Sequence, residues 1–81
     1  MKYILLKRFT KQLENFSIST QKKFWNRLDH LLNNFYYPSL QLKKYDESRG
    51  IWQGRVDRKV RFYFLIEDDT YILLEIKKHP K

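Results

Sequence analysis

The spacing of apolar residues changes from a helical period to a strand period about halfway along this 81-residue chain. Phe9, Leu13 and Phe16 recur at intervals of four and three residues, and a longer series of the same kind runs from Phe24 to Phe35. Such intervals place side chains on one face of an α-helix. From Trp52 onward apolar and polar residues alternate, which places them on opposite faces of a strand. The pattern predicts two helices followed by a meander of consecutive strands.

The boundaries of these elements are marked by capping and breaking residues. β-favouring residues at Tyr3–Leu6 predict a first strand within Met1–Arg8. Thr10 is the predicted cap of the first helix, and Ser17 or Ser19 of the second. Pro38 is expected to end the second helix, because the residue before a proline is disfavoured in helical geometry. The stretch 37–50 is then predicted to be a basic loop.

Parity decides which face of the sheet each side chain occupies. The inward, apolar set has even numbers: Trp52, Val56, Val60, Phe62, Phe64, Ile66, Ile72, Leu74 and Ile76. The outward set has odd numbers: Gln53, Arg55, Asp57, Arg61, Tyr63, Glu75, Lys77 and His79. A turn centred on Arg58 would pair Arg55 with Arg61 and keep the two sets apart. The acidic stretch 67–70 is interpreted as the second turn rather than as a metal site.

These elements predict an α+β fold in one domain that spans residues 1–81. Two N-terminal helices are expected to pack on the even face of a mostly antiparallel four-stranded sheet, in the element order β-α-α-β-β-β. The longest apolar run has five residues, far below the ~20 needed for a membrane span, and no signal peptide is apparent. The chain is therefore expected to be cytoplasmic.

The charge of the chain favours a polyanionic partner. Lys and Arg number 17 against nine Asp and Glu, which gives a net charge of +8. Seven basic residues lie between positions 41 and 61: Lys43, Lys44, Arg49, Arg55, Arg58, Lys59 and Arg61. A solvated basic surface would explain many of the lysines but fewer of the arginines. Cys is absent and only two His are present, so neither a cofactor nor a metal is expected.

The odd face carries groups that suit phosphodiester cleavage. Attack by an RNA 2′-hydroxyl requires a proton acceptor, a proton donor for the leaving 5′-oxygen, and cations for the charge that develops on the phosphate. Arg55 and Arg61 fit the last role, and His79 is the candidate for proton transfer on this face. Alternatively, Arg61 pairs across strands with Glu75, and His79 is only a tail residue. Nucleic-acid binding is predicted for Lys43, Lys44, Arg49 and Arg58.

The segment from Tyr37 to His79 resembles the RelE/ParE superfamily of toxins from type II toxin–antitoxin systems. The resemblance is carried by Pro38, Leu40, Lys43, Lys44, Trp52, Arg55-Val56, Arg61-Phe62, Leu73-Leu74, Ile76 and His79. It implies the RelE-like fold, a metal-independent endoribonuclease that cuts mRNA at the ribosome, and an acidic antitoxin as partner. Arg61 would match the arginine that stabilises the scissile phosphate, Arg55 a second phosphate-side arginine, and His79 the acid/base position.

The same resemblance leaves two other functions open. The ParE branch shares the fold and inhibits DNA gyrase, and Trp52, Arg55 and Arg61 do not separate the two branches. A catalytically weak relative that only binds its antitoxin is the other alternative. Pro80 follows His79 here, whereas several ribonucleases of this family carry Tyr at that position.

Overall fold

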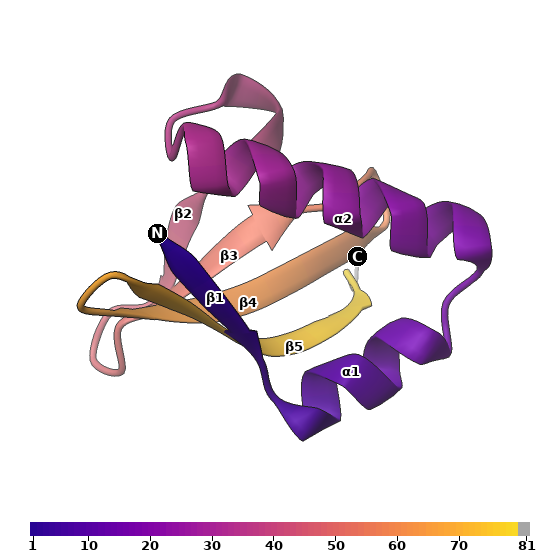
Figure 1. Ribbon diagram of the computed structural model, residues 1–81, viewed down its shortest axis with the longest axis horizontal. Helices are drawn as coiled ribbons and strands as arrows, with labels where there is room; N and C mark the ends of the chain where they lie inside the picture. The colour runs from indigo at the N-terminus through magenta and orange to yellow at the C-terminus, as the bar shows by residue number, and fades with distance from the viewer. Residues whose placement is uncertain (80–81) are drawn as a thin grey trace.

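A twisted five-stranded sheet forms the centre of the computed structural model, which describes residues 1–79 (Figure 1). The elements in chain order are β1 (Lys2–Leu5), α1 (Lys7–Glu14), α2 (Ile18–Asn33), the 3₁₀ turn η1 (Pro38–Leu40), β2 (Lys43–Asp46), β3 (Ile51–Arg55), β4 (Val60–Glu67) and β5 (Thr70–Lys78). The strand order across the sheet is β1-β5-β4-β3-β2. Strand β1 runs parallel to β5, and the other neighbouring pairs are antiparallel. The predicted α+β fold with two N-terminal helices on a mostly antiparallel sheet is confirmed.

The sheet has one strand more than the predicted four. Strand β2 lies within the stretch that was expected to be a loop, where Lys43 pairs with Gln53 and Lys44 with Trp52. The strand has only four residues and carries two adjacent lysines, so it lacks the apolar alternation that identifies a buried strand. Short, charged strands of this kind are typical of sheet edges.

Both helices lie where the apolar periodicity places them, although two boundary predictions are wrong. Helix α1 begins three residues before Thr10, and its N-cap position, Leu6, makes no side-chain cap. Helix α2 is capped as predicted by Ser17, whose hydroxyl accepts a hydrogen bond from the Thr20 amide. It ends at Asn33, and Pro38 opens the η1 turn instead of ending the helix. Within residues 1–79, no helix has the length and apolar character needed to cross a membrane.

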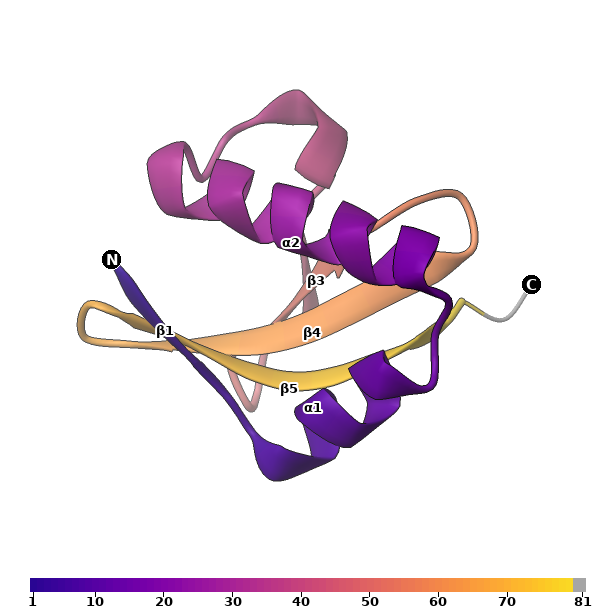
Figure 2. The same ribbon diagram turned by 45° about the vertical axis from the view of Figure 1, so that its right-hand side comes forward.

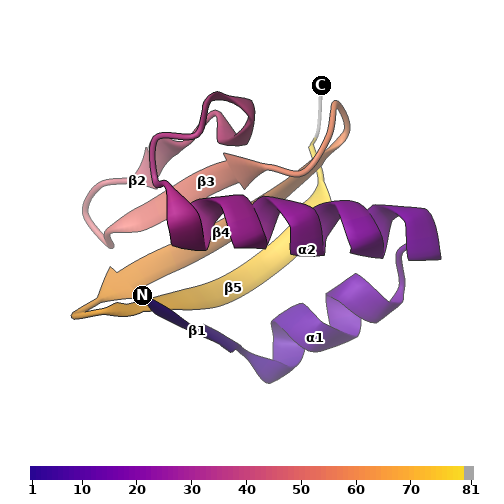
Figure 3. The same ribbon diagram turned by 45° about the horizontal axis from the view of Figure 1, so that its top comes forward.

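Helix α2 crosses one face of the sheet, and the core lies between them (Figure 3). The ring of Phe24 contacts Phe9 of α1 at 5.1 Å and Phe62 of β4 at 5.7 Å between centroids. Gly54 lies opposite Phe62 in the neighbouring strand, and a Cβ at that glycine would stand 2.4 Å from the tip of the Phe62 ring. The glycine therefore makes room for the aromatic ring beneath α2.

A β-bulge in β5 changes the predicted parity of that strand. Tyr63 pairs with Glu75, but the next β4 residue, Phe64, pairs with Leu73, so Leu74 is the extra residue. Before the bulge it is odd-numbered Tyr71 and Leu73 that are buried in the core, and after it the even-numbered Ile76. The predictions that Ile72 and Leu74 face the helices are therefore wrong. Strict alternation along one strand does not anticipate an inserted residue.

Helix α1 lies beside β5, past the end of β1, and completes the edge of the sheet there (Figure 2). The Leu6 amide donates to the Leu73 carbonyl at 3.1 Å, where the β1 pairing ends. Further along β5, the Ile76 amide donates to Oε1 of Gln12 in α1 at 2.9 Å. A side chain of α1 thus replaces the missing strand as hydrogen-bond partner. Figure 2 shows α2 on one face of the sheet and α1 along its β5 edge; we call the face opposite α2 the open face.

Candidate nucleic-acid interface

Three cationic residues form a row across the strands on the face opposite α2. Arg61 of β4 is paired with Arg55 of β3 on one side and with Lys77 of β5 on the other. The predicted Arg55–Arg61 pairing is thus present, and Lys77 extends it to a third strand. Neighbouring strands are about 4.8 Å apart, so three cationic residues occupy adjacent backbone positions. Like charges directly opposite each other destabilise a sheet, and a bound anion would relieve that repulsion. We call Arg55, Arg61 and Lys77 the cationic row.

Both arginines of the row are held by neighbouring carbonyl groups. Arg61 Nη1 donates to the backbone carbonyl of Asp57 at 2.6 Å and to that of Val60 at 3.2 Å. Arg55 Nη1 donates to Gln41 Oε1 at 2.9 Å, at the edge of the sheet. In each case one nitrogen of the guanidinium fork is engaged, and the others remain available for a phosphate. The alternative ion pair between Arg61 and Glu75 does not form, because Arg61 lies opposite Lys77 in the register.

His79 lies at the same end of the sheet as the cationic row. Its backbone amide donates to the Lys59 carbonyl at 2.6 Å, which extends the β4–β5 ladder by one residue. His79 is exposed, and its position two residues after Lys77 gives it the same parity as the row. The structure therefore places all three predicted catalytic residues at one end of the sheet. The predictions that concern Pro80 and Lys81 lie outside the described residues.

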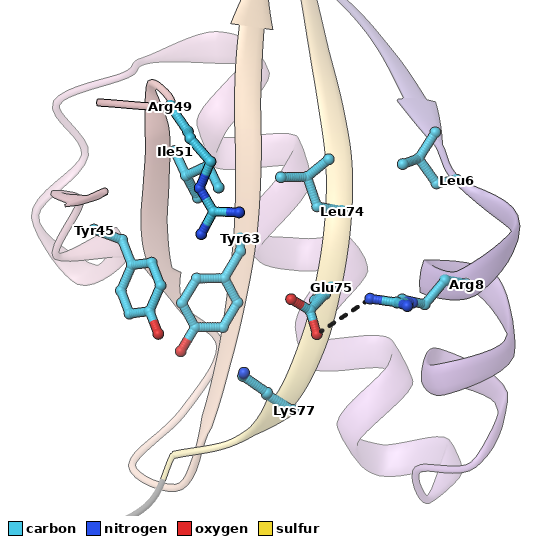
Figure 4. A pocket seen from close by; sticks show the side chains of 9 residues that line it. All are labelled: Leu6, Arg8, Tyr45, Arg49, Ile51, Tyr63, Leu74, Glu75 and Lys77. Carbon is cyan, nitrogen blue, oxygen red and sulfur yellow. Dashed lines mark ion pairs between the residues drawn. The ribbon is translucent and has the colours of Figure 1, made fainter. Parts of the chain in front are cut away.

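A hollow of about 470 Å³ lies beside the row on the same face (Figure 4). It is bounded by β2, the β2–β3 turn, β3, β4, β5, the residue that joins β1 to α1 and the start of α1. Its lining residues are Leu6, Arg8, Tyr45, Arg49, Ile51, Tyr63, Leu74, Glu75 and Lys77. Lys77 belongs both to the row and to this hollow. The row and the hollow therefore form one continuous surface, with cations on three sides of an aromatic floor.

Tyr63 forms the floor of the hollow and is only 4% exposed although it faces away from the helices. The ring of Tyr45 packs against it at 4.7 Å between centroids, and Lys77 Nζ lies 5.3 Å from its ring centroid. Burial and the neighbouring Tyr45 and Glu75 raise the pKa of Tyr63 above its ordinary value, and Arg61 offsets this only in part. Tyr63 is therefore a neutral phenol at physiological pH.

Two ion pairs flank the hollow and hold two of its cations. Arg8 Nη1 lies 4.0 Å from Glu75 Oε1 (Figure 4). Arg49 Nε lies 2.7 Å from Asp46 Oδ2. Hydrogen bonds from Arg49 and Ser48 lower the pKa of Asp46 to about 2. Lys77 has no carboxylate within ion-pair distance among residues 1–79. Its ammonium group is therefore the free cation of the hollow.

The four predicted nucleic-acid-binding residues divide between the two faces. Lys43 pairs with Gln53 on the open face, and Arg49 lines the hollow. Lys44 turns the other way and places Nζ 4.7 Å from the centre of the Trp52 ring. Arg58 lies at the tip of the β3–β4 turn, on the side of α2. The adjacent lysines separate because they belong to a strand, not to a loop.

Some residues of this surface carry no sequence signal. Arg8 and Tyr45 are far from the cationic row along the chain, and only the sheet order brings them to its side. Tyr45 belongs to β2, which was expected to be a loop, and it is skipped in the pairing of β2 with β3. Glu67 and Asp69 flank the β4–β5 turn, where Asp68 adopts a positive φ of 54°. In residues 1–79, no three His, Asp or Glu side chains gather as a metal ion would require.

The fold was compared with known proteins. No protein-family model matches the sequence, and a comparison with curated protein sequences finds no match either. Among solved structures, a YoeB/ParE toxin from Agrobacterium tumefaciens superposes with a TM-score of 0.82 at 12% identity, over 99% of this chain and 100% of that chain.

Two toxin–antitoxin complexes are similar to the chain over comparable lengths. The YoeB–YefM complex from Staphylococcus aureus matches with a TM-score of 0.79 at 14% identity, covering 99% of this chain and 98% of that chain. The RelE–RelB complex from Pyrococcus horikoshii gives 0.79 at 15% identity, covering 95% and 92%. The chain therefore has the fold that these YoeB, ParE and RelE toxins share.

Proposed function

We propose that this protein is the toxin of a type II toxin–antitoxin pair and that it cleaves mRNA on the ribosome, in the cytoplasm. The observation that carries the proposal is the cationic row, because like charges on three adjacent strands call for an anionic ligand. The structural relatives add support, since two of them are toxins in complex with antitoxins. An acidic antitoxin segment would be attracted to a chain of net charge +8.

The reaction is transfer of the phosphate from the 5′-oxygen to the neighbouring 2′-oxygen. The 2′-hydroxyl attacks phosphorus, its proton passes to a base, the bond between phosphorus and the 5′-oxygen breaks, and that oxygen receives a proton. The products are a 2′,3′-cyclic phosphate and a free 5′-hydroxyl. Glu75 is the carboxylate of the hollow and takes the role of base, and His79 takes that of acid. The added charge on the phosphate oxygens is stabilised by Arg55 and Arg61, so the proposal requires no metal ion.

Cleavage of ribosome-bound mRNA by the purified protein tests this function. Arg61→Gln is expected to slow cleavage by about 10²–10³-fold, because it removes the fork that binds the phosphate in the transition state. His79→Ala should lower the rate by a comparable factor. Lys22→Gln removes one positive charge at an exposed position of α2. It serves as the matched control and should leave the cleavage rate unchanged.

Three results would overturn the proposal. RNA that stays intact with the wild-type protein excludes the nuclease. Broken DNA that accumulates while transcripts remain whole points to gyrase inhibition instead. Equal cleavage rates for Arg61→Gln and Lys22→Gln would show that the cationic row is not part of the catalytic site.

A further inference from the structure

A second basic hollow lies on the helix side of the β3–β4 turn, away from the open face. It has a volume of about 450 Å³ and is enclosed by α2, η1, the end of β3 and the turn. Four cationic residues line it: Lys23, Arg27, Arg55 and Arg58. We call it the hairpin pocket. Only Arg55 is shared with the cationic row.

The arginines of the hairpin pocket are oriented by hydrogen bonds to the protein itself. Arg27 Nε donates to the Val56 carbonyl at 3.1 Å, and its Nη1 donates to Asn26 Oδ1 at 3.1 Å. Arg55 is held in the same way by Gln41. These bonds occupy part of each guanidinium fork and leave Nη2 without a protein partner within residues 1–79. Such preorganised, partly free forks match the oxygens of a phosphate.

The wall of the pocket also contains a polar atom with an unmet hydrogen bond. Ser39 Oγ is buried and has no partner within the described part of the chain. A buried hydroxyl without a partner is costly, and most such groups in folded proteins are satisfied. A ligand oxygen in the pocket could accept its proton. Oε1 of the neighbouring Gln41 already binds Arg55, which leaves the Gln41 amide as another donor.

The single carboxylate of the pocket is engaged by the turn. Asp57 Oδ1 accepts from the amides of Lys59 and Val60 at 2.8 and 2.9 Å, and Oδ2 lies 3.7 Å from Lys23 Nζ. Partial burial acts to raise the pKa of Asp57, but these hydrogen bonds and the charge of Lys23 outweigh it and lower the pKa. Four cations and one carboxylate leave an excess of positive charge.

We propose that the hairpin pocket binds a phosphate group and that, if the proposed function holds, this is a backbone phosphate of the same RNA strand. The donors converge from forks, a hydroxyl and an amide, which suits the tetrahedral oxygens of a phosphate better than a planar carboxylate. Arg55 connects the two sites, because it pairs with Arg61 in the sheet and also lines the pocket. An RNA strand that leaves the cationic row therefore crosses the sheet edge at Arg55 and enters the pocket.

The first experiment follows the arginine Nε–Hε signals of the full-length protein by NMR during titration with inorganic phosphate, with chloride as the control. Phosphate is expected to shift the signals of Arg27 and Arg55, and the Lys23→Gln/Arg58→Gln variant should bind it at least several-fold more weakly. If phosphate shifts these signals no more than chloride does, the pocket is not a phosphate site. The inference is also overturned if a polyglutamate peptide shifts them while phosphate does not.

The second experiment measures binding of a 2′-deoxy oligonucleotide, which cannot be cleaved, over a range of salt concentrations. Each phosphate contact with a single strand contributes a slope of about −0.7 in log K against log salt concentration. Lys23→Gln/Arg58→Gln should reduce the slope by about one such contact. The matched control Lys11→Gln/Lys22→Gln removes two exposed charges from the helices and should leave it unchanged.

The two experiments separate this inference from the proposed function. A phosphate response in NMR together with a salt slope that the variant does not reduce means that the pocket binds phosphate but not the RNA strand, which overturns the second half of the proposal. Binding of phosphate and oligonucleotide by a protein that leaves RNA intact contradicts only the nuclease. Unfolding temperatures of both double variants confirm that the compared proteins are folded.

Discussion

The two faces of the sheet are built from the same strands but serve different ends. The face beneath α2 is filled by apolar rings and chains such as Phe62, Phe64 and Ile76, each at most 1% exposed. The opposite face places Arg55, Arg61 and Lys77 at neighbouring positions on three strands, a pairing of like charges that is unfavourable in a sheet. Because successive side chains alternate across a strand, packing on one face can support unfavourable charge on the other. Substitutions on the helix face should therefore lower stability, whereas substitutions in the cationic row should lower binding.

The largest expected effect on stability comes from Gly54→Ala on the helix face. Its Cβ would lie 2.4 Å from the Phe62 ring, which is fully buried and packed between Phe24 and Phe64. Overpacking of this kind destabilises a core by about 1–3 kcal/mol. We expect a corresponding decrease in the free energy of unfolding, measured with urea.

A double-mutant cycle tests whether the Phe62 ring causes that loss. Phe62→Leu shortens the side chain and should remove much of the additional cost of Gly54→Ala. Strictly additive free energies would contradict the contact. RNA binding by Gly54→Ala should stay unchanged under conditions where the variant is folded, because the open face is not altered.

A smaller effect of opposite sign is expected from Lys77→Glu in the cationic row. The new carboxylate would lie opposite Arg61 and replace a repulsion by an attraction, worth about 0.2–1 kcal/mol. Loss of the contact between Lys77 and the Tyr63 ring reduces this gain. We expect stability at low salt to stay equal or rise, while affinity for RNA falls.

Lys78→Glu is the matched control for that comparison, since it changes the net charge by the same amount at the next residue. Lys78 pairs with Val60 and has the opposite parity to the row. It should weaken RNA binding less than Lys77→Glu. Equal losses of affinity would show that net charge, and not the row, determines binding.

Much of the fold follows from the sequence because one physical signal, apolar periodicity, recurs over many residues. Both helices and the last three strands were predicted from it, and so was the pairing of Arg55 with Arg61. The features it missed are local. Strand β2 is a short charged edge without alternation, and the bulge at Leu74 depends on how β5 pairs with β4. Neither the edge strand nor the bulge produces an apolar periodicity that could be recognised in the sequence.

The site was less predictable because its residues come from distant segments. Parity predicted Arg61 and His79 on one face of the sheet, and the pairing of β4 with β5 brings both to the same end. The aromatic floor needed tertiary information, because Tyr45 reaches Tyr63 only through the pairing of β2 with β3. The hairpin pocket also depends on the position of α2 over the β3–β4 turn, which contributes Lys23 and Arg27.

The smallest expected effect concerns Asp46, at the rim of the open face. Its pKa is about 2 rather than the ordinary 3.8, chiefly through the hydrogen bond from Arg49 and then that from Ser48. A pKa lowered in the folded state means that the interaction is fully present above about pH 3.8 and is lost as the pH falls through about 2.

NMR can follow the titration midpoint of the Asp46 carboxyl group in variants. Arg49→Gln should raise this midpoint more than Ser48→Ala does. Arg8 lines the same hollow but pairs with Glu75, so Arg8→Gln should leave the Asp46 midpoint unchanged. Because the pair is at the surface, the unfolding temperature at neutral pH should change little in all three variants. A large change would mean that the open face contributes to stability as the helix face does, and the contrast between the faces would be wrong.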